Sequence, residues 1–471
     1  MRRILTILAL ALSASLQASV PSGSISDFID DEMPASGAPG LVYAVVTDGE
    51  LAEAGARGVI KAGGDDALTP DTPFIIGSVS KSFTALAVMQ LVEAGKVELD
   101  AELSQDLTEF SGSPSSAITI RQLLSHTSGF STYQGNVSHN NVEGGDDVLA
   151  HQAAQIAKLS PDSAPGTKWE YSNNNYKLLG RLIEVVSGQD FQSYVKANIL
   201  EPVGMTNSFV ADGKSHDGMA IGHRPWFGSK RPLSDTKTHR GSAPQGGTIA
   251  SANDLALYMQ MMMNGEDDVL SAEGKAAMMS PASDVSPFYG LGWFIDTEQG
   301  TVSHSGSSPG FEALATMVPS QNKGVVVLVN AGSGIGFGET IQLRNGVTAR
   351  AIGLDYAGEA SRFWQKAMFI GLALLPVVYL LCMAWAWRQR AKLRAKSGAF
   401  GQFSLWFPLL TTIVAAGFIV FVVPKFFGAS MATIRLFQPD TGLILPAAAV
   451  LGVLWAVFRL GVAYSGKAKA N

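Results

Sequence analysis

The sequence of 471 residues predicts an α+β domain followed by three membrane-spanning helices. Three observations support this fold class. Segments rich in β-branched and aromatic residues lie at both ends of residues 22–360, with helical patterns between them, as expected when terminal strands meet in one antiparallel sheet. Three long apolar runs follow in residues 361–471, and the N-terminus has the composition of an export sequence.

Residues 1–20 are predicted to be a signal peptide. Two arginines at the start precede an apolar run over residues 4–12, which is followed by small residues up to Ala18. This order is typical of a secretory signal. Cleavage after Ala18 would put Leu16 at a position that prefers a small residue, so an uncleaved anchor stays as the alternative. In both cases the chain from about residue 22 onward is exported.

The exported domain, residues 22–360, begins and ends with predicted strands. At its start, residues 41–46 and 51–59 flank the dipeptide Asp48-Gly49 and predict a β-hairpin. Residues 79–94 predict a helix that is apolar around most of its circumference, so this helix is expected in the core. The other predicted elements are helices at 175–187, from Ser251 onward and at 339–352, and strands at 289–295, 301–304, 311–318 and 324–330.

The tail, residues 361–471, is predicted to cross a membrane three times. Its apolar runs cover about 367–387, 403–423 and 443–463, and each approaches the roughly 20 residues that a membrane-spanning helix needs. Five basic residues between Arg388 and Lys396 follow the first run, and positive charge beside a span marks the cytoplasmic side. The sequence therefore predicts a multi-pass protein of a bacterial cytoplasmic membrane, with the exported domain on the periplasmic side.

Charge is divided unevenly along the chain. Twelve of the 34 Lys and Arg residues, but only one of the 40 Asp and Glu residues, lie from Ser361 onward. The exported domain is therefore acidic, which argues against a nucleic-acid partner because phosphates would repel it. Cys382 is the only cysteine and lies in the first apolar run, so neither a disulfide nor a cysteine-based metal site is expected. No metal and no cofactor is predicted.

The segment from Gly77 to Lys81 carries the strongest candidate for catalysis. A serine hydroxyl is a weak nucleophile that needs a nearby base, and a lysine three residues further along a helix lies on the same face. Burial makes such a lysine easier to deprotonate. The Ser-x-x-Lys pattern occurs four times in this chain, but only Ser78 opens an apolar helix. We therefore expect Ser78 to be the nucleophile and Lys81 to activate it.

Two further motifs contain groups suited to proton transfer and substrate binding. In Tyr171-Ser172-Asn173, the phenol can relay protons and the amide can orient a lysine or a substrate carbonyl; a polar turn before a helix is the alternative. In His304-Ser305-Gly306, the imidazole can bind or protonate a substrate group, and the glycine permits close approach to a substrate backbone. A purely structural histidine is the alternative there.

In their order along the chain, the three motifs resemble those of penicillin-recognising serine hydrolases. The resemblance is closest to the branch that contains class C β-lactamases, D-Ala-D-Ala carboxypeptidases and family VIII esterases, and it covers about residues 28–352. Residues 120–129, 246–251 and 305–311 are similar to the same branch. The resemblance implies the β-lactamase/transpeptidase-like fold, in which an antiparallel sheet flanked by helices is joined by a helical subdomain.

The resemblance also implies roles for individual residues. Ser78 forms the acyl-enzyme, while Lys81 and Tyr171 share the general-base role, with the choice between them left open. The groups implied to contact the substrate are Asn173, His304, Gly306 and Ser307. Among these, Asn173 binds the substrate amide, and the backbone N–H groups of Ser78 and Ser307 form the oxyanion hole.

The third motif departs from the β-lactamase pattern. Such enzymes usually carry Lys-Thr-Gly where this chain has His304-Ser305-Gly306, so a permanent cation is replaced by a group only partly charged at pH 7. We therefore expect a membrane-anchored hydrolase that cleaves D-amino-acid peptides or acyl esters rather than an efficient β-lactamase. The alternative is a cell-wall-binding sensor that signals through its membrane helices. The expected partners are a small-molecule or peptide substrate, with cell-wall fragments among the candidates, and membrane lipid.

Overall fold

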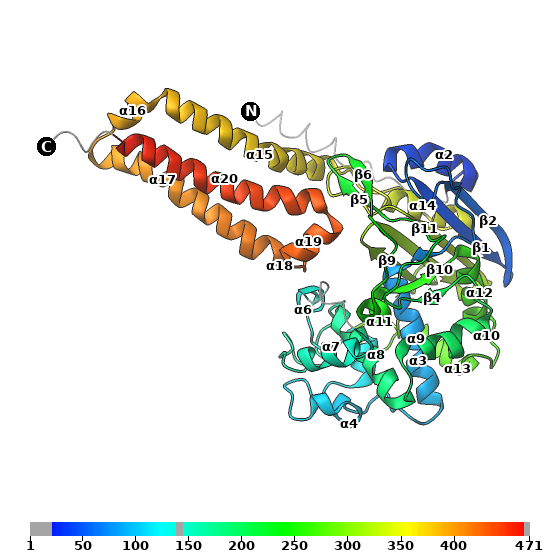
Figure 1. The fold of residues 1–471 in the computed structure, drawn as a ribbon. Coiled ribbons are helices and arrows are strands. Elements are labelled where there is room, and N and C mark those ends of the chain that lie inside the picture. The colour runs from blue at the N-terminus through cyan, green and yellow to red at the C-terminus, as the bar shows by residue number, and fades with distance from the viewer. Residues whose placement is uncertain (1–20, 138–144, 466–471) are drawn as a thin grey trace, which may run out of the picture.

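The computed structural model describes residues 21–137 and 145–465. The predicted signal peptide, residues 1–20, lies outside them. The chain forms a globular part and a long three-helix bundle that projects from it (Figure 1). The predicted fold class is confirmed: strands and helices are mixed in the globular part, and three helices in the tail are long and apolar enough to cross a membrane.

A six-stranded antiparallel sheet forms the centre of the globular part, with the strand order β2-β1-β11-β10-β9-β8. Its strands are β1 (Gly40–Thr47), β2 (Glu50–Gly58), β8 (Phe294–Asp296), β9 (Thr301–Ser308), β10 (Phe311–Val318) and β11 (Lys323–Val329). Strand β1 pairs with β11, so that Leu41 lies opposite Val329 and Val46 lies opposite Gly324. Strands from the two ends of the domain therefore meet in one sheet, as the sequence predicted.

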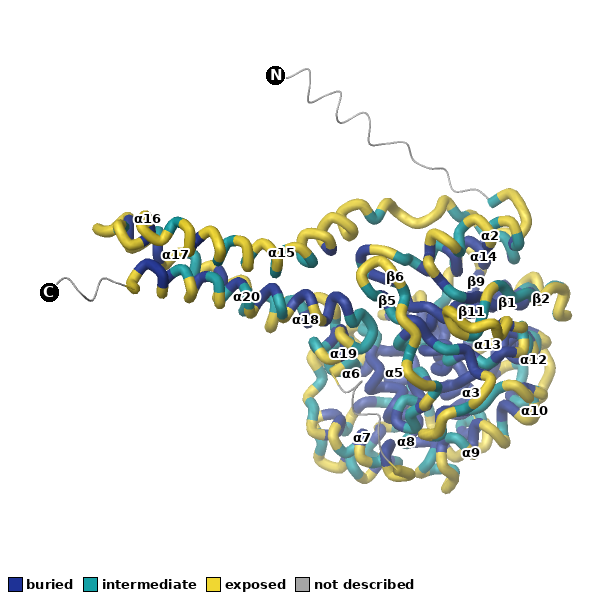
Figure 2. Tube along the Cα trace, turned by 45° about the horizontal axis from the view of Figure 1, so that its top comes forward, coloured by how far each residue is buried: buried dark blue, intermediate teal, exposed yellow. Residues whose placement is uncertain are grey.

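Both faces of this sheet are buried, because successive side chains of β1 point into two different cores. Val42 and Val46 belong to the larger core, whereas Leu41 and Val45 belong to the smaller one. Helices α2 (Ile25–Ser36) and α14 (Ile341–Ile352) lie over the smaller core, and α12 (Ala252–Met263) packs on the sheet from the side of the larger core (Figure 2). Helix α3 (Ser80–Glu93) lies within the larger core.

The rest of the globular part consists of short helices and two small sheets. One small sheet has the order β3-β7-β4, and the other is the hairpin β5-β6. Their strands are β3 (Phe74–Ile75), β4 (Phe209–Val210), β5 (His223–Trp226), β6 (Ser229–Pro232) and β7 (Thr248–Ala250). The helices are α4 (Leu103–Asp106), α5 (Ile120–Leu124), α6 (Thr132–Val137), α7 (Val148–Ile156), α8 (Asn173–Ser187), α9 (Phe191–Val195), α10 (Glu201–Val203), α11 (Ala243–Gly246) and α13 (Ala272–Met278), with single turns η1 (Gly77–Val79), η2 (Thr108–Phe110), η4 (Lys196–Leu200), η5 (Arg240–Ser242) and η6 (Pro319–Gln321).

Some element boundaries differ from the predicted ones. The predicted strand at 289–295 pairs in the sheet only over Phe294–Asp296, because Gly292 adopts a φ of 83°, which an extended strand does not allow. Strand β9, by contrast, continues to Ser308, four residues beyond its predicted end. Helix α2 and the hairpin β5-β6 were not predicted. Helix α2 contains Pro34, and a proline is unfavourable in the interior of a helix, so the sequence does not indicate a helix there.

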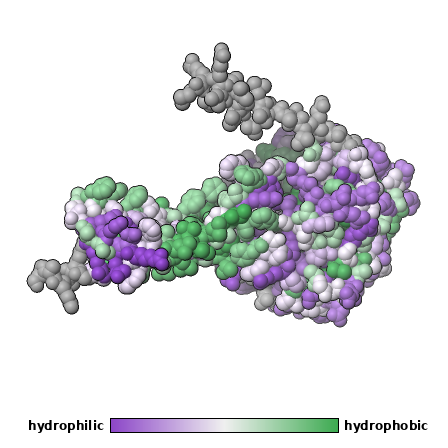
Figure 3. Space-filling model, turned by 90° about the horizontal axis from the view of Figure 1, so that it is seen from above, coloured by the Kyte–Doolittle hydropathy of each residue, from purple (hydrophilic) through white to green (hydrophobic). Residues whose placement is uncertain are grey.

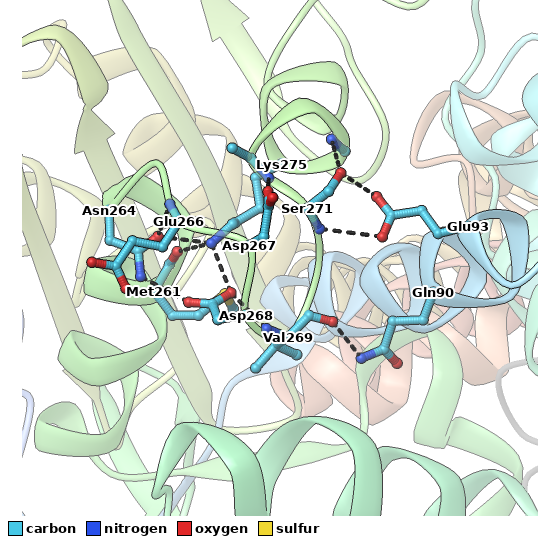
Figure 4. A network of polar contacts seen from close by, with 12 residues as sticks. Gln90, Glu93, Met261, Asn264, Glu266, Asp267, Asp268, Val269, Ser271 and Lys275 are labelled. Atoms are coloured by element: carbon cyan, nitrogen blue, oxygen red, sulfur yellow. Dashed lines mark hydrogen bonds and ion pairs between the residues drawn. The ribbon is translucent and has the colours of Figure 1, made fainter.

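The buried helix α3 is held at its C-terminal end by the loop 264–271. The Gln90 side-chain amide donates to the carbonyl oxygen of Val269 at 2.9 Å. The Glu93 carboxylate accepts from the backbone N–H of Ser271 at 3.2 Å (Figure 4). Because α3 is fixed at this end and enclosed by the core, its N-terminal end has a defined position at the edge of the sheet.

The tail forms three long helices that enclose the predicted spans at 367–387, 403–423 and 443–463. They are α15 (Phe363–Arg388), the continuous run Gly398–Phe426, and α20 (Pro439–Tyr464). The second run comprises α17 (Gly398–Gly417), η7 (Phe418–Val422) and α18 (Val423–Phe426). Helix α16 (Arg390–Arg394) joins the first two at the far end, and α19 (Met431–Phe437) lies between the last two at the globular end. Apolar side chains form a band along the bundle (Figure 3), as lipid contact requires.

The bundle is attached to the globular part by polar and aromatic contacts. The Asp440 carboxylate at the start of α20 accepts from the backbone N–H of Phe227 at 3.0 Å. Arg224 donates to the carbonyl oxygen of Leu436 in α19 at 3.2 Å. The ring of Phe369 in α15 packs near that of Phe227, with 6.4 Å between their centroids. Strand β5, the turn after it, and α19 therefore join the two parts.

Candidate active site

Ser78 lies in the 3₁₀ turn η1, directly before α3. The turn and helix form one continuous helical segment, so the prediction that Ser78 opens a buried helix is confirmed within one turn. Gly77 adopts a φ of 54°, a conformation that favours glycine. This backbone geometry presents Ser78 at the edge of the sheet, where strand β9 passes.

Two glycines allow strand β9 to approach this turn closely. A Cβ atom on Gly306 would lie 1.9 Å from the carbonyl oxygen of Ile76 and 3.1 Å from the backbone nitrogen of Ser78. A Cβ atom on Gly77 would lie 2.7 Å from the backbone nitrogen of Ser307. The sequence predicted that Gly306 permits close approach to a substrate backbone; in the structure its close neighbour is the protein's own turn. The approach brings the backbone of Ser307 against that of Gly77, next to Ser78.

Lys81 is fully buried one helical turn after Ser78 and contacts three uncharged acceptors. Its Nζ lies 3.1 Å from Ser78 Oγ, 2.8 Å from Asn173 Oδ1 and 2.7 Å from the carbonyl oxygen of Gln245. Burial lowers the pKa of Lys81 well below its ordinary value, and the positive charge of Lys177 lowers it further. The neutral amine is therefore favoured at this position.

A second buried lysine shows the contrasting, structural arrangement. Lys275 Nζ lies 2.8 Å from a carboxylate oxygen of Asp268, 2.7 Å from Asn264 Oδ1 and 3.0 Å from the carbonyl oxygen of Met261 (Figure 4). The Asp268 carboxylate is an oppositely charged partner for this lysine. Lys81 contacts only neutral oxygens in its three hydrogen bonds, so it lacks the carboxylate partner that Lys275 has.

The neutral form of Lys81 fits its three contacts atom by atom. A neutral amine has two N–H bonds and one lone pair. The oxygens of Asn173 and Gln245 can only accept, so they take both N–H groups. The lone pair is then left for the third neighbour, the hydroxyl group of Ser78. This arrangement is suited to removing the Ser78 proton.

Tyr171 lies beside the serine and the lysine. Lys81 Nζ is 4.8 Å from the centroid of the Tyr171 ring. The Tyr171 hydroxyl is buried, and burial raises its pKa above the ordinary value, although the neighbouring Ser78 hydroxyl offsets part of this rise. Tyr171 therefore carries its proton at neutral pH and is suited to donating or relaying it.

Both ends of the Asn173 amide are engaged within the protein. Its Oδ1 accepts from Lys81 at 2.8 Å, and its Nδ2 donates to Asn136 Oδ1 at 2.8 Å. Asn173 also lines the cavity above Ser78, where a substrate amide would be placed. The amide orientation is thus fixed by Asn136, which sequence reasoning did not single out.

His304 is buried and neutral. Its Nδ1–H donates to the carbonyl oxygen of Ser305 at 2.7 Å, so Nε2 is the acceptor for the Tyr289 hydroxyl at 3.2 Å. Burial is the main cause that lowers the pKa of His304 to about 3, and the hydrogen bond to the Ser305 carbonyl opposes this shift. The expected partial charge at pH 7 is therefore wrong. Both ring nitrogens are occupied by protein groups.

Besides Asn136, the sequence did not identify two other residues that shape this site. His126 adopts a φ of 59°, and its Nδ1 accepts from the backbone N–H of Ser172 at 3.1 Å while its ring lies 4.3 Å from that of Tyr171. Gln245 contributes its carbonyl oxygen to Lys81. His126 lies within the segment 120–129, noted only for its resemblance, whereas a backbone carbonyl such as that of Gln245 leaves no mark in a sequence.

A cavity of about 600 Å³ lies over Ser78. Its lining includes Asn136, Asn173 and Ser307 around the serine, and residues of the segment between the second and third long helices on another side. Within residues 21–137 and 145–465, no group of three or more His, Cys, Asp or Glu side chains is arranged to hold a metal ion.

Comparisons with known proteins place the globular part among serine hydrolases. The family model described as Beta-lactamase matches residues 25–345. Penicillin-binding protein 4 of Amycolatopsis lactamdurans is 30% identical over 323 residues, which are 64% of this chain and 82% of that protein. Protein flp of Staphylococcus aureus (strain MRSA252) is 28% identical over 319 residues, which are 66% of this chain but only 63% of that protein.

Solved structures show the same fold. The octameric penicillin-binding protein homologue from Pyrococcus abyssi superimposes with a TM-score of 0.60 at 27% identity, covering 70% of this chain and 77% of that chain. A class C beta-lactamase superimposes with a TM-score of 0.58 at 20% identity, covering 70% of this chain and 94% of that chain. The family match ends before α15, so the three-helix bundle lies outside it.

Proposed function

Because the chain belongs to the beta-lactamase family of serine hydrolases, we propose that it is a membrane-anchored hydrolase that cleaves an amide or ester through an acyl-enzyme on Ser78. The observation that carries this proposal is the environment of Lys81. Two neutral acceptors take its N–H groups, and the remaining contact, at 3.1 Å, is with Ser78 Oγ. A serine hydroxyl becomes an effective nucleophile when such a base removes its proton.

The proposed reaction has two halves. Ser78 Oγ attacks the substrate carbonyl carbon while its proton passes to Lys81 Nζ, and the backbone N–H groups of Ser78 and Ser307 stabilise the oxyanion. The C–N or C–O bond then breaks while Tyr171, close to both groups, donates its proton to the leaving group and takes the proton held by Lys81 in return. In the second half a water molecule attacks the acyl carbonyl carbon and gives a proton to neutral Lys81. The bond between the acyl carbon and Ser78 Oγ then breaks, Ser78 Oγ regains a proton from Lys81 through Tyr171, and the carboxylic acid is released.

Lys81 is the better candidate for the base than Tyr171. Burial disfavours the charged form of both groups, so it lowers the pKa of the lysine and raises the pKa of the phenol. Burial therefore favours the neutral amine of the lysine and the protonated form of the phenol. A base must start without its proton, so this function is assigned to Lys81.

The neutral His304 bears on the substrate class. A permanent cation at this position would attract a substrate carboxylate, as found in β-lactams and in peptides that end in D-alanine. The pKa of His304, about 3, removes that attraction at neutral pH. We therefore favour esters and amides that carry no carboxylate, including D-amino-acid amides, over β-lactams. Acyl groups from cell-wall fragments remain among the candidate substrates.

The proposed location is the periplasmic face of a bacterial cytoplasmic membrane. Helix α16, with the basic residues from Arg388 to Lys396, lies at the end of the bundle opposite to the globular part (Figure 1). Basic residues beside a span favour the cytoplasmic side, which supports a location of the catalytic domain outside the cytoplasm. The export-type composition of residues 1–20 supports the same orientation.

Replacement of the nucleophile tests the proposal. We expect Ser78→Ala in the full-length protein to reduce hydrolysis of p-nitrophenyl acetate by at least about 10³-fold, because losing the nucleophile removes nearly all covalent catalysis. The matched control is Ser320→Ala, since Ser320 begins another Ser-x-x-Lys sequence but is exposed in the turn η6. Activity retained in Ser78→Ala would refute the assignment. In a separate assay, the wild-type rates on a β-lactam, a D-alanyl peptide, a D-amino-acid amide and a short ester give the order of substrate preference.

A further inference from the structure

The cavity over Ser78 has walls from two parts of the chain. One part is the globular domain, which supplies Ser78 and Asn173. The other is the segment 427–438, which follows α18 and contains α19, and which we call the connector. Its apolar residues in the cavity lining are Phe427, Ala429, Ile434, Leu436 and Phe437. A segment between two membrane helices therefore forms an apolar wall of the candidate active site.

The connector is hydrogen-bonded to the catalytic groups rather than merely lying near them. Asn136 Nδ2 donates to the carbonyl oxygen of Gly428 at 2.9 Å, and Thr433 Oγ1 donates to the carbonyl oxygen of Asn136 at 2.9 Å. Asn136 Oδ1 in turn accepts from Asn173, which contacts Lys81. Two amide side chains thus link the connector to the lysine that activates Ser78.

The connector also has a defined conformation of its own. The Ser430 hydroxyl accepts from the backbone N–H of Thr433 at 3.1 Å and caps α19. Gly428 adopts a φ of 56°, and a Cβ atom there would lie 3.0 Å from Thr132 Cγ2, so this backbone passes directly over α6. Figure 1 shows α18 and α19 at the globular end of the bundle, beside α6. The wall is therefore a built part of the site.

The apolar wall begins at the residue that follows the second membrane-spanning helix. Phe421 near the end of the second long helix is 71% exposed and Phe426 is 80% exposed, as suits side chains in contact with hydrocarbon. The next residue, Phe427, is 45% exposed and lines the cavity. An apolar chain that leaves the membrane leaflet at this end of the bundle therefore meets Phe427 as the first ring of the cavity wall.

We propose that the substrate is a membrane-resident amphiphile, whose ester or amide bond lies at Ser78 while its apolar chain lies against the connector and extends into the leaflet. This inference rests on the proposed hydrolase function and adds the class of substrate. Each CH₂ group transferred from water to an apolar wall favours binding by about fourfold. A substrate with a long chain is therefore selected over one that carries only a short acyl group.

The test uses the full-length protein in lipid nanodiscs and two series of esters. One series varies the acyl chain of p-nitrophenyl esters from acetyl to dodecanoyl, and the other varies the alcohol of alkyl acetates, so that a chain on either side of the scissile bond is detected. We expect kcat/KM to rise with chain length in at least one series. Phe427→Ala is expected to reduce the ratio of long-chain to short-chain kcat/KM by about 15-fold, because roughly two CH₂ groups lose their apolar cover.

The adjacent aromatic residue provides a matched control. Phe426→Ala removes the same side chain from an exposed position that does not line the cavity, so it should leave the chain-length ratio unchanged. Partitioning of long-chain esters into the nanodisc is common to all variants, so equal ratios in wild type, Phe427→Ala and Phe426→Ala would overturn the inference. Ser78-dependent hydrolysis without chain-length preference in either series would also overturn it, while leaving the proposed function intact. If the wild type hydrolyses none of the esters faster than Ser78→Ala does, the proposed function itself is refuted.

Discussion

The assignment of Lys81 as the base leads to a prediction about two substitutions in the same site. Lys81→Met retains a long apolar side chain in the buried position but removes the nitrogen lone pair. General-base catalysis contributes about 10²–10⁴-fold, which corresponds to roughly 3–5 kcal/mol of transition-state stabilisation. We expect kcat for p-nitrophenyl acetate to fall by this factor. Tyr171→Phe, which keeps the ring and removes only the hydroxyl, should cost about tenfold because a neutral phenol serves only as a relay.

The structure also gives the stability cost of the lysine substitution. Lys81→Met leaves Asn173 Oδ1 and the carbonyl oxygen of Gln245 without the donor that each has now. A buried polar group that loses its partner costs about 1–3 kcal/mol, so the variant should melt at a lower temperature than the wild type. The activity must therefore be expressed per folded molecule, for example by thermal melting of each variant before the assay at a temperature where both are folded.

The pH–rate profile separates a chemical effect of Lys81→Met from a structural one. The neutral amine is the active form and burial lowers its pKa, so wild-type activity should fall toward acid pH, and this acid limb should lie below the pH range in which an ordinary lysine titrates. Lys81→Met should lose this acid limb along with its rate. The reasoning is refuted if Tyr171→Phe loses more activity than Lys81→Met, or if the acid limb persists in Lys81→Met.

Two further predictions concern Asn136 and His304. Asn136→Ala should lower kcat about tenfold with little change in KM for a short ester, because the amide of Asn173 loses the partner that fixes its orientation toward the lysine; an unchanged kcat would contradict this positioning role. His304 has a folded-state pKa of about 3, against roughly 6.5 in an unfolded chain, so the unfolded state binds the proton more readily and stability is lost as pH falls below about 6.5. At pH 5 this loss is roughly 2 kcal/mol, and the melting temperature of His304→Gln should decline less between pH 7 and pH 5 than that of wild type, whereas the exposed control His151→Gln should behave like wild type.

The candidate site was predictable from sequence to the extent that its chemistry is local. Ser78 and Lys81 are three residues apart, and the helix that follows brings them together without help from the rest of the chain. Tyr171 and His304 were identified because their motifs stand in a recognisable order. Their protonation states were not predictable, because burial sets them and burial depends on what packs around each group.

The connector illustrates what sequence reasoning could not reach. The apolar runs beside it predict membrane helices, since length and hydropathy along a single segment suffice for that inference. Nothing in the run of residues from 427 to 438 indicates that it lies over the nucleophile. Thr433 and Asn136 are separated by 297 positions in the chain, and their hydrogen bond exists only because the bundle docks on the globular part.

The sequence by itself determined the fold class, the three apolar spans and the pairing of Ser78 with Lys81, because each depends on a period or spacing within a short stretch of chain. Tertiary structure alone decided that His304 is neutral, that the carbonyl oxygen of Gln245 orients Lys81, and that a segment of the membrane region walls the cavity. These features arise where distant segments pack together and exclude water. The energies of these features depend on residues that are distant in the sequence, so a pattern within a short stretch of chain does not predict them.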